Sequence, residues 1–229
     1  QFRSWLAEDR RSDMLVGAWS RPLFMGGWRE STETDTEVVN IQTPSIFIDL
    51  RFPRSRPRGL SSRKGFECLS LAELRILAEQ HCFAGYSLMV ENDVCVRHHA
   101  IDWNFHPSFP RSRPNKWRAE VSPEGHSFKE YGFAKDDASG QAIYMERWQR
   151  LGSSTSGSGA KVPYLAMRSE DRILAVVGDH WAFARDRPSV GQFATAKTGG
   201  CANLVQDAVQ RGDRASAIRM LDMEGSCGQ

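Results

Sequence analysis

Two segments of this chain alternate apolar with polar residues and end at proline, and this pattern constrains the fold more than any other feature. They span residues 48–53 and 101–107. Successive side chains of a β-strand point to opposite faces, so each segment predicts a strand with one apolar and one ionisable face. The ionisable faces carry Asp49 and Arg51 in the first segment, and Asp102, Asn104 and His106 in the second. Either the polar face meets solvent on an open sheet, or it lines a pocket inside a barrel.

The same hexapeptide, Phe-Pro-Arg-Ser-Arg-Pro, occurs at 52–57 and at 109–114, close to the end of each segment. Two such loops would place several arginines at one rim, where planar guanidinium groups suit carboxylate or phosphate ligands. The alternative is that the prolines and arginines simply keep two loops extended and solvated.

The composition excludes several classes of protein. The 229 residues are 40% hydrophobic and 25% charged, which is ordinary for a globular chain, and the net charge of +2 gives no support for nucleic-acid binding. The five cysteines show no CxxC spacing, which favours reduced thiols. No stretch has 18 consecutive apolar residues, so we expect a cytoplasmic protein without a membrane partner. The first residue is Gln1, which leaves open a targeting segment removed ahead of it.

Short strand-like runs separated by turn residues dominate the chain. Ser70 and Glu73 have capping-box spacing ahead of an apolar helical pattern, which predicts a helix near 70–80. The Gly/Ser-rich segment 151–160 predicts a flexible loop. About ten strands with one or two peripheral helices indicate a mainly β protein, and a sheet of that size hides its edges by closing. We therefore expect a single domain, 1–229, built on a closed antiparallel barrel.

Gly17-Ala18-Trp19, at the first predicted strand, resembles the Gly-x-Trp signature of the calycins, the lipocalin-like β-barrels. In that superfamily the tryptophan closes the barrel floor beneath an arginine from a late strand, and the resemblance matches this arginine to Arg185. It implies a calycin-like barrel, whereas the Thr-Asp-Tyr motif of secreted lipocalins is absent from the sequence. Fold alone does not give function.

Ionisable residues on the predicted inner faces are the candidates for chemistry. Burial raises the pKa of a carboxyl group and a neighbouring arginine lowers it, so one pocket can hold both a charged group and a proton donor. The expected catalytic residues are Asp102, His106 and Glu146, with Arg51 holding an anionic part of the substrate. The expected ligand-binding residues are Asp49, Arg51, His98, Trp103, Asn104, Glu130, Tyr144 and Trp148. The alternative for the acidic residues is a set of cross-strand salt bridges.

No metal or cofactor is expected. His98 and His106 lie eight residues apart, which separates them by roughly 27 Å along one strand, too far to share a metal ion. Gly-rich phosphate loops and known catalytic motifs are missing from the sequence.

Three functions stay open. The first is a cofactor-independent enzyme that acts on a small polar or amphipathic molecule by carboxylate and histidine acid–base chemistry. The second is an intracellular lipocalin-like protein that binds a small ligand without catalysis. The third is an interaction module with its polar face outside. The observation that separates them is which face of residues 98–106 is buried. The sequence does not determine the oligomeric state.

Overall fold

The computed structural model describes residues 10–26, 29–31, 36–57, 65–91, 94–103, 115–133, 141–152, 154, 162–186, 201–222 and 224–229. Asn104, His106, the second Phe-Pro-Arg-Ser-Arg-Pro loop and most of the predicted loop 151–160 lie outside these residues.

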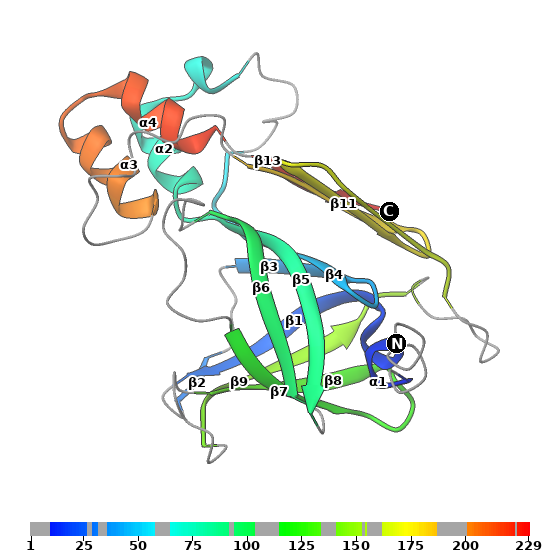
Figure 1. Ribbon diagram of the computed structural model, residues 1–229. Helices are drawn as coiled ribbons and strands as arrows, with labels where there is room; N and C mark the ends of the chain where they lie inside the picture. Colours follow the sequence, from blue (N-terminus) through cyan, green and yellow to red (C-terminus); the bar gives the residue numbers. More distant parts are fainter. Residues whose placement is uncertain are drawn as a thin grey trace.

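A closed antiparallel barrel forms the first part of the molecule (Figure 1). Eight strands pair in chain order, and the last returns to pair with the first. The short strand β2 (Arg29–Ser31) pairs beside β1. The fold class expected from the sequence is confirmed, with eight barrel strands instead of about ten. Their bounds are β1 (Gly17–Gly26), β3 (Thr36–Gln42), β4 (Ile46–Pro53), β5 (His81–Glu91), β6 (Val94–Asp102), β7 (Asn115–Val121), β8 (Ser127–Phe133) and β9 (Ala142–Arg150).

A second, four-stranded antiparallel sheet lies against one side of the barrel (Figure 1). Its order is β10 (Tyr164–Arg168), β11 (Arg172–Val177), β12 (His180–Arg185) and β13 (Glu224–Gly228). Strands β11 and β12 pack on β3 and β4. The sequence predicted these later strands as part of the barrel, and they form a separate layer because the barrel already closes between β1 and β9.

The helices sit mostly at one end of this second sheet (Figure 1). Helix α2 (Leu71–Leu77) falls within the range predicted near 70–80, and the Ser70/Glu73 capping box is formed. It follows a short 3-10 helix, η2 (Phe66–Cys68), and packs with α3 (Cys201–Gln210) and α4 (Arg214–Leu221). Helix α1 (Arg10–Leu15) lies apart from these, at the barrel.

The larger hydrophobic core lies outside the barrel wall, between the two sheets and the helices. Ile48 and Leu50 of β4 and Ile101 of β6 are buried there. Ile173 and Ala175 of β11 belong to the same cluster. The apolar face of each alternating strand therefore points outward into this core, and the polar face points into the barrel.

A second, smaller core fills one end of the barrel interior. Trp19 is fully buried there, and its ring centroid lies 4.7 Å from that of Phe128. The Trp19 indole N–H donates to the Leu15 carbonyl at 2.9 Å. The guanidinium of Arg150, from β9, covers the Trp19 ring at 4.1 Å and donates to the Val16 carbonyl at 2.5 Å. Helix α1, the start of β1 and the end of β9 are therefore tied together at this end.

The arginine expected over Trp19 was Arg185, and that assignment is wrong. Arg185 ends β12 in the second sheet and donates to Asp222 at 2.8 Å. The barrel's last strand is β9, so the arginine that reaches Trp19 is Arg150. Burial lowers the pKa of Arg150 to about 10, so its side chain stays a cation at neutral pH.

Replacing Trp19 by alanine is expected to lower the free energy of unfolding by about 3–5 kcal/mol, because a large buried aromatic side chain is lost. Denaturant melts measure this, with Trp181→Ala as the matched control. Trp181 is 36% exposed on the second sheet, and its truncation should have a clearly smaller effect. Equal effects of the two variants would contradict the role of Trp19.

Candidate functional site

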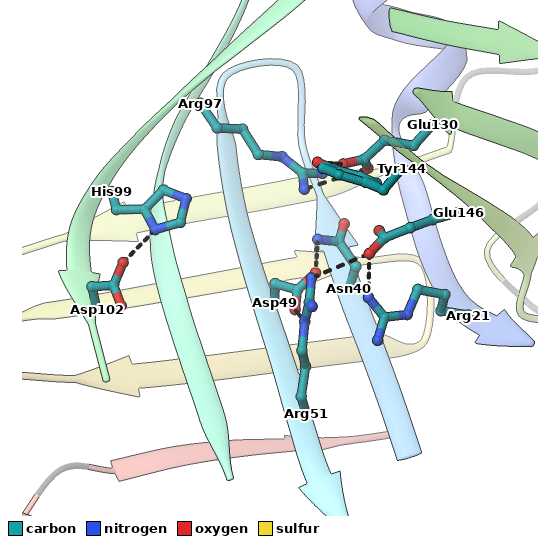
Figure 2. Close-up of polar contacts among 10 residues, drawn as sticks. All are labelled: Arg21, Asn40, Asp49, Arg51, Arg97, His99, Asp102, Glu130, Tyr144 and Glu146. Atoms are coloured by element: carbon teal, nitrogen blue, oxygen red, sulfur yellow. Dashed lines mark hydrogen bonds and ion pairs between the residues drawn. The ribbon is translucent and has the colours of Figure 1, made fainter. Parts of the chain in front are cut away.

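Ionisable side chains from five barrel strands, with one amide side chain from a sixth, converge in the barrel interior (Figure 2). They lie next to the tryptophan-rich end of the barrel. The charged side chains are almost completely buried apart from that of Arg51, which is 23% exposed, and Tyr144 is half-buried. The interior set is Arg21 from β1, Asn40 from β3, Asp49 and Arg51 from β4, Arg97 from β6, Glu130 from β8, and Tyr144 and Glu146 from β9.

Asp49 and Arg51 form the first charged pair. They are two residues apart on β4, so they share its inner face, and Arg51 Nε donates to Asp49 Oδ1 at 2.7 Å. Asn40, directly opposite Asp49 on β3, donates its amide to the other carboxylate oxygen at 3.3 Å. Burial alone would raise the pKa of Asp49, but Arg51 and the more distant arginines outweigh it and lower the pKa. Asp49 is therefore ionised at neutral pH.

Glu146 and Glu130 face each other across β8 and β9. Arg21 pairs with Glu146 Oε1, and Arg51 Nη2 lies 3.9 Å from the same oxygen. Glu130 has weaker cationic support, because Arg97 Nη1 is 3.7 Å from its Oε2. Burial, followed by repulsion from Glu146, raises the pKa of Glu130 from 4.5 to about 7. The two facing carboxyl groups thus differ in their surroundings, as expected for sites that separate a charged group from a proton donor.

The hydroxyl of Tyr144 donates to Glu130 Oε1 at 3.1 Å. Burial and the two glutamates raise the pKa of Tyr144 well above 10, so the hydroxyl stays protonated. Gly132 lies opposite Tyr144, and a Cβ at Gly132 would lie 1.9 Å from the Tyr144 ring. Glycine is therefore required for this ring to lie over β8.

A buried histidine and aspartate form a separate pair at one side of the interior (Figure 2). His99 Nδ1 and Asp102 Oδ2 are 2.6 Å apart, and the imidazole stacks on Phe83 at 4.6 Å. These residues are three apart on β6, so regular alternation would place them on opposite faces. The pairing of β5 with β6 shifts at Ala100, and this bulge turns both side chains inward.

The bulge overturns the predicted position of His98. The sequence predicted His98 as a ligand-binding residue, and regular alternation along the strand would place it on the same face as Asp102. His98 is instead exposed on the outside, and His99 takes the inner position. Gly85 makes this possible, because a Cβ at Gly85 would lie 2.0 Å from the His98 carbonyl oxygen.

The structure brings together five of the nine predicted site residues that it describes. Asp49, Arg51, Glu130, Tyr144 and Glu146 meet in the interior as Figure 2 shows. Trp148 is fully buried in the tryptophan cluster at the closed end. Trp103 is buried in the outer core, where its indole N–H points to the Ala78 carbonyl at 3.5 Å.

Sequence reasoning missed Arg21, Asn40, Arg97 and His99. Arg21 carried a usable signal, since it is two residues after Trp19 and so shares its inward face. Asn40 carried one too, because it lies directly opposite Asp49 in the hairpin of β3 and β4, two strands joined by a short connection. Arg97 and His99 could not be assigned without the bulge.

A scan against models of known protein families finds no match, and a search of curated proteins finds none either. Among the described residues, no group of histidine, cysteine, aspartate or glutamate side chains is arranged to hold a metal ion. No helix in the described part of the chain is long and apolar enough to cross a membrane.

Glu130→Gln is expected to gain stability relative to the wild type as pH rises from about 4.5 to 7, by up to about 3 kcal/mol. In this window the unfolded wild type has lost its Glu130 proton while the folded protein retains it, so wild-type stability falls with pH. Above pH 7 the difference should level off. Urea melts at pH 5, 6, 7 and 8 measure it.

The matched control for that experiment is Glu120→Gln, because Glu120 is exposed and pairs with Lys129 on the surface. Its stability difference from the wild type should change little over the same range. A flat difference for Glu130→Gln as well would mean that Glu130 titrates as an ordinary surface carboxyl group.

Proposed function

We propose that this protein binds a small polar molecule inside the barrel. The observation that carries the proposal is a buried polar interior whose hydrogen-bonding capacity is unfilled. Within the described residues, Glu130 Oε2, Glu146 Oε2, Arg97 Nε, and the indole N–H groups of Trp117 and Trp148 are buried without a hydrogen-bond partner. Buried polar atoms are rarely left so, and each costs about 1–3 kcal/mol unless water or a ligand meets it.

Stability does not account for this interior. Replacing buried ion pairs with apolar side chains of similar volume is often neutral or stabilising, so a barrel that needed only to fold could fill its interior with hydrophobic residues. Its own closed end shows this, with Trp19, Trp117 and Trp148 packed around Phe128. Charged residues a short way along the same strands therefore favour a function in recognition or chemistry.

The resemblance to calycins supports binding. An eight-stranded closed barrel, a Gly-x-Trp segment on its first strand and Arg150 covering that tryptophan agree with the architecture that the resemblance implies. Barrels of about eight strands are wide enough to hold one small ligand. The ionisable lining favours a polar ligand over a long apolar chain.

The facing pair Glu130 and Glu146 favours acid–base catalysis as a second candidate function. One carboxyl group with a pKa near 7, beside a second carboxyl group that is paired with Arg21, is suited to moving a proton at neutral pH. His99 and Asp102 offer a second pair on the opposite wall. Of the catalytic residues predicted from the sequence, Asp102 and Glu146 stay candidates, and Glu130 joins them.

Native mass spectrometry of the purified protein tests binding. We expect a bound small molecule that is retained by the folded protein and lost on acid unfolding. The same molecule, added back, should raise the melting temperature of the wild type and of Glu120→Gln alike, because Glu120 is on the outer surface. Protein that carries no bound molecule and is stabilised by none of a broad panel of polar metabolites would contradict the proposal.

The captured molecule also separates binding from catalysis. If the protein is an enzyme, the molecule or its precursor is converted on incubation, and Glu130→Gln should lower turnover by about 10²- to 10⁴-fold with little change in affinity. Glu120→Gln should leave turnover unchanged. A molecule that returns chemically unaltered after prolonged incubation identifies a binding protein.

A further inference from the structure

Arg97 differs from the other two arginines of the barrel interior because it has no close carboxylate partner among the described residues. Arg51 donates to Asp49 at 2.7 Å, and Arg21 is paired with Glu146. Among the described residues, the ion pair of Arg97 is the 3.7 Å approach to Glu130, which is longer than a hydrogen bond. Its Nε is buried without an acceptor in this part of the chain, a property that is not special to Arg97. An unmet donor in a buried site is costly.

Two aromatic rings fix this guanidinium in place. The Arg97 Cζ lies 4.7 Å from the ring centroid of Phe47 and 4.7 Å from that of Trp117. The contacts orient the planar group by its faces, so its N–H donors at the edge stay available. Trp117 adds another buried donor, because its indole N–H has no acceptor within the described part of the chain.

In the cluster around Arg97 and Glu130, which does not include the His99–Asp102 pair at one side of the interior, the charges match a single negative charge. Arg21, Arg51 and Arg97 contribute three positive charges, and Asp49 and Glu146 contribute two negative charges. The remaining carboxyl group, Glu130, is faced by Glu146 and Tyr144 from β9, by Arg97 from β6, and by Arg51 and Asp49 from β4. When Glu130 keeps its proton, the set has one positive charge in excess. A dianion would leave the buried site with an excess negative charge, which is expensive to bury.

We propose that Arg97 binds the carboxylate group of a small organic monoanion inside the barrel, with the Trp117 indole N–H as a neighbouring donor. This inference rests on the proposed binding function and names the class of its ligand. A carboxylate can accept two hydrogen bonds from a guanidinium at once, so it would satisfy the unmet donor. A carboxylate also carries a single negative charge and matches the planar geometry of the guanidinium. The sequence had assigned this role to Arg51, whose guanidinium is already held by Asp49 and Glu146.

Binding of such an anion should be coupled to a proton. A carboxylate next to Glu130 adds to the repulsion from Glu146, so the ligand favours the protonated form of Glu130. The protonated carboxyl group can then donate a hydrogen bond to the ligand. Affinity should therefore fall as pH rises above about 7, where the free protein loses this proton. Glu130→Gln keeps a neutral donor at the same place and should make binding nearly independent of pH.

Sodium acetate and its neutral isostere acetamide are the probes. Titration of ¹⁵N-labelled protein at pH 6 should shift the indole N–H signal of Trp117 and the Nε–H signal of Arg97 with acetate, and leave them unchanged with acetamide and with sulfate, which is a dianion at this pH. At pH 8 the wild type should bind acetate up to about 10-fold more weakly than at pH 6, and Glu130→Gln should bind it as it does at pH 6, because one pH unit beyond a coupled pKa changes affinity by at most about 10-fold.

Arg97→Lys and Arg97→Gln test whether the Arg97 guanidinium binds the anion. The lysine variant keeps the charge and the fold but lacks the planar fork, and the glutamine variant lacks both. Both should weaken acetate binding at pH 6 by about 10-fold or more. The matched control is Arg118→Gln, because Arg118 is exposed on β7 and covers Phe133 at 5.3 Å. It should bind acetate as the wild type does.

The outcomes separate this inference from the proposed function. Acetate binding that survives in Arg97→Lys, shifts caused equally by acetamide, or a captured molecule that is neutral or cationic would overturn the assignment of a monoanion to Arg97. The barrel would still be a binding protein in each case. Failure to detect acetate together with failure to capture any molecule would overturn both.

Discussion

The structure depends on one constraint: strands β4 and β6 present Ile48, Leu50 and Ile101 on the face that points away from the barrel. A lone barrel would expose Ile48, Leu50 and Ile101 to water, so a second layer has to cover them. The β10–β13 sheet and helices α2, α3 and α4 provide it, and small residues such as Ala175 and Ala182 let the sheet approach closely. Because this outer layer forms the main hydrophobic core, the barrel interior does not have to be hydrophobic.

A main core outside the barrel wall permits a charged interior, which is the unusual property of this barrel. Each buried ion carries a desolvation cost that only close partners offset. Asp49 and Glu146 have such partners in Arg51 and Arg21. Glu130 does not, since its facing residue is another glutamate, and its proton is the least costly way to keep it buried. The combination of a poorly held carboxyl group and a poorly held Arg97 makes this wall of the barrel the part where an added molecule would gain most.

Alternation along single strands predicted the interior well wherever the strands are regular. It placed Asp49 with Arg51 on one face, and it placed Glu130 and Glu146 on predicted inner faces. The structure shows these positions inward. It failed on β6, because a bulge at Ala100 shifts the alternation by one residue and exchanges His98 for His99. Whether a strand has a bulge depends on its neighbour, here on the absence of a side chain at Gly85. A one-residue shift of this kind reverses every later side chain.

The sequence by itself determined the mainly β class, the helix capped by Ser70, the two-faced character of the strands and most of the acidic residues that end up buried, because each of these depends on neighbours within a few positions. The tertiary structure decided how many strands close the barrel, and so that Arg150 rather than Arg185 covers Trp19. It also decided that the apolar face is the outer one. These outcomes depend on pairing between β1 and β9, more than a hundred residues apart, and no local pattern encodes which distant strand completes a sheet.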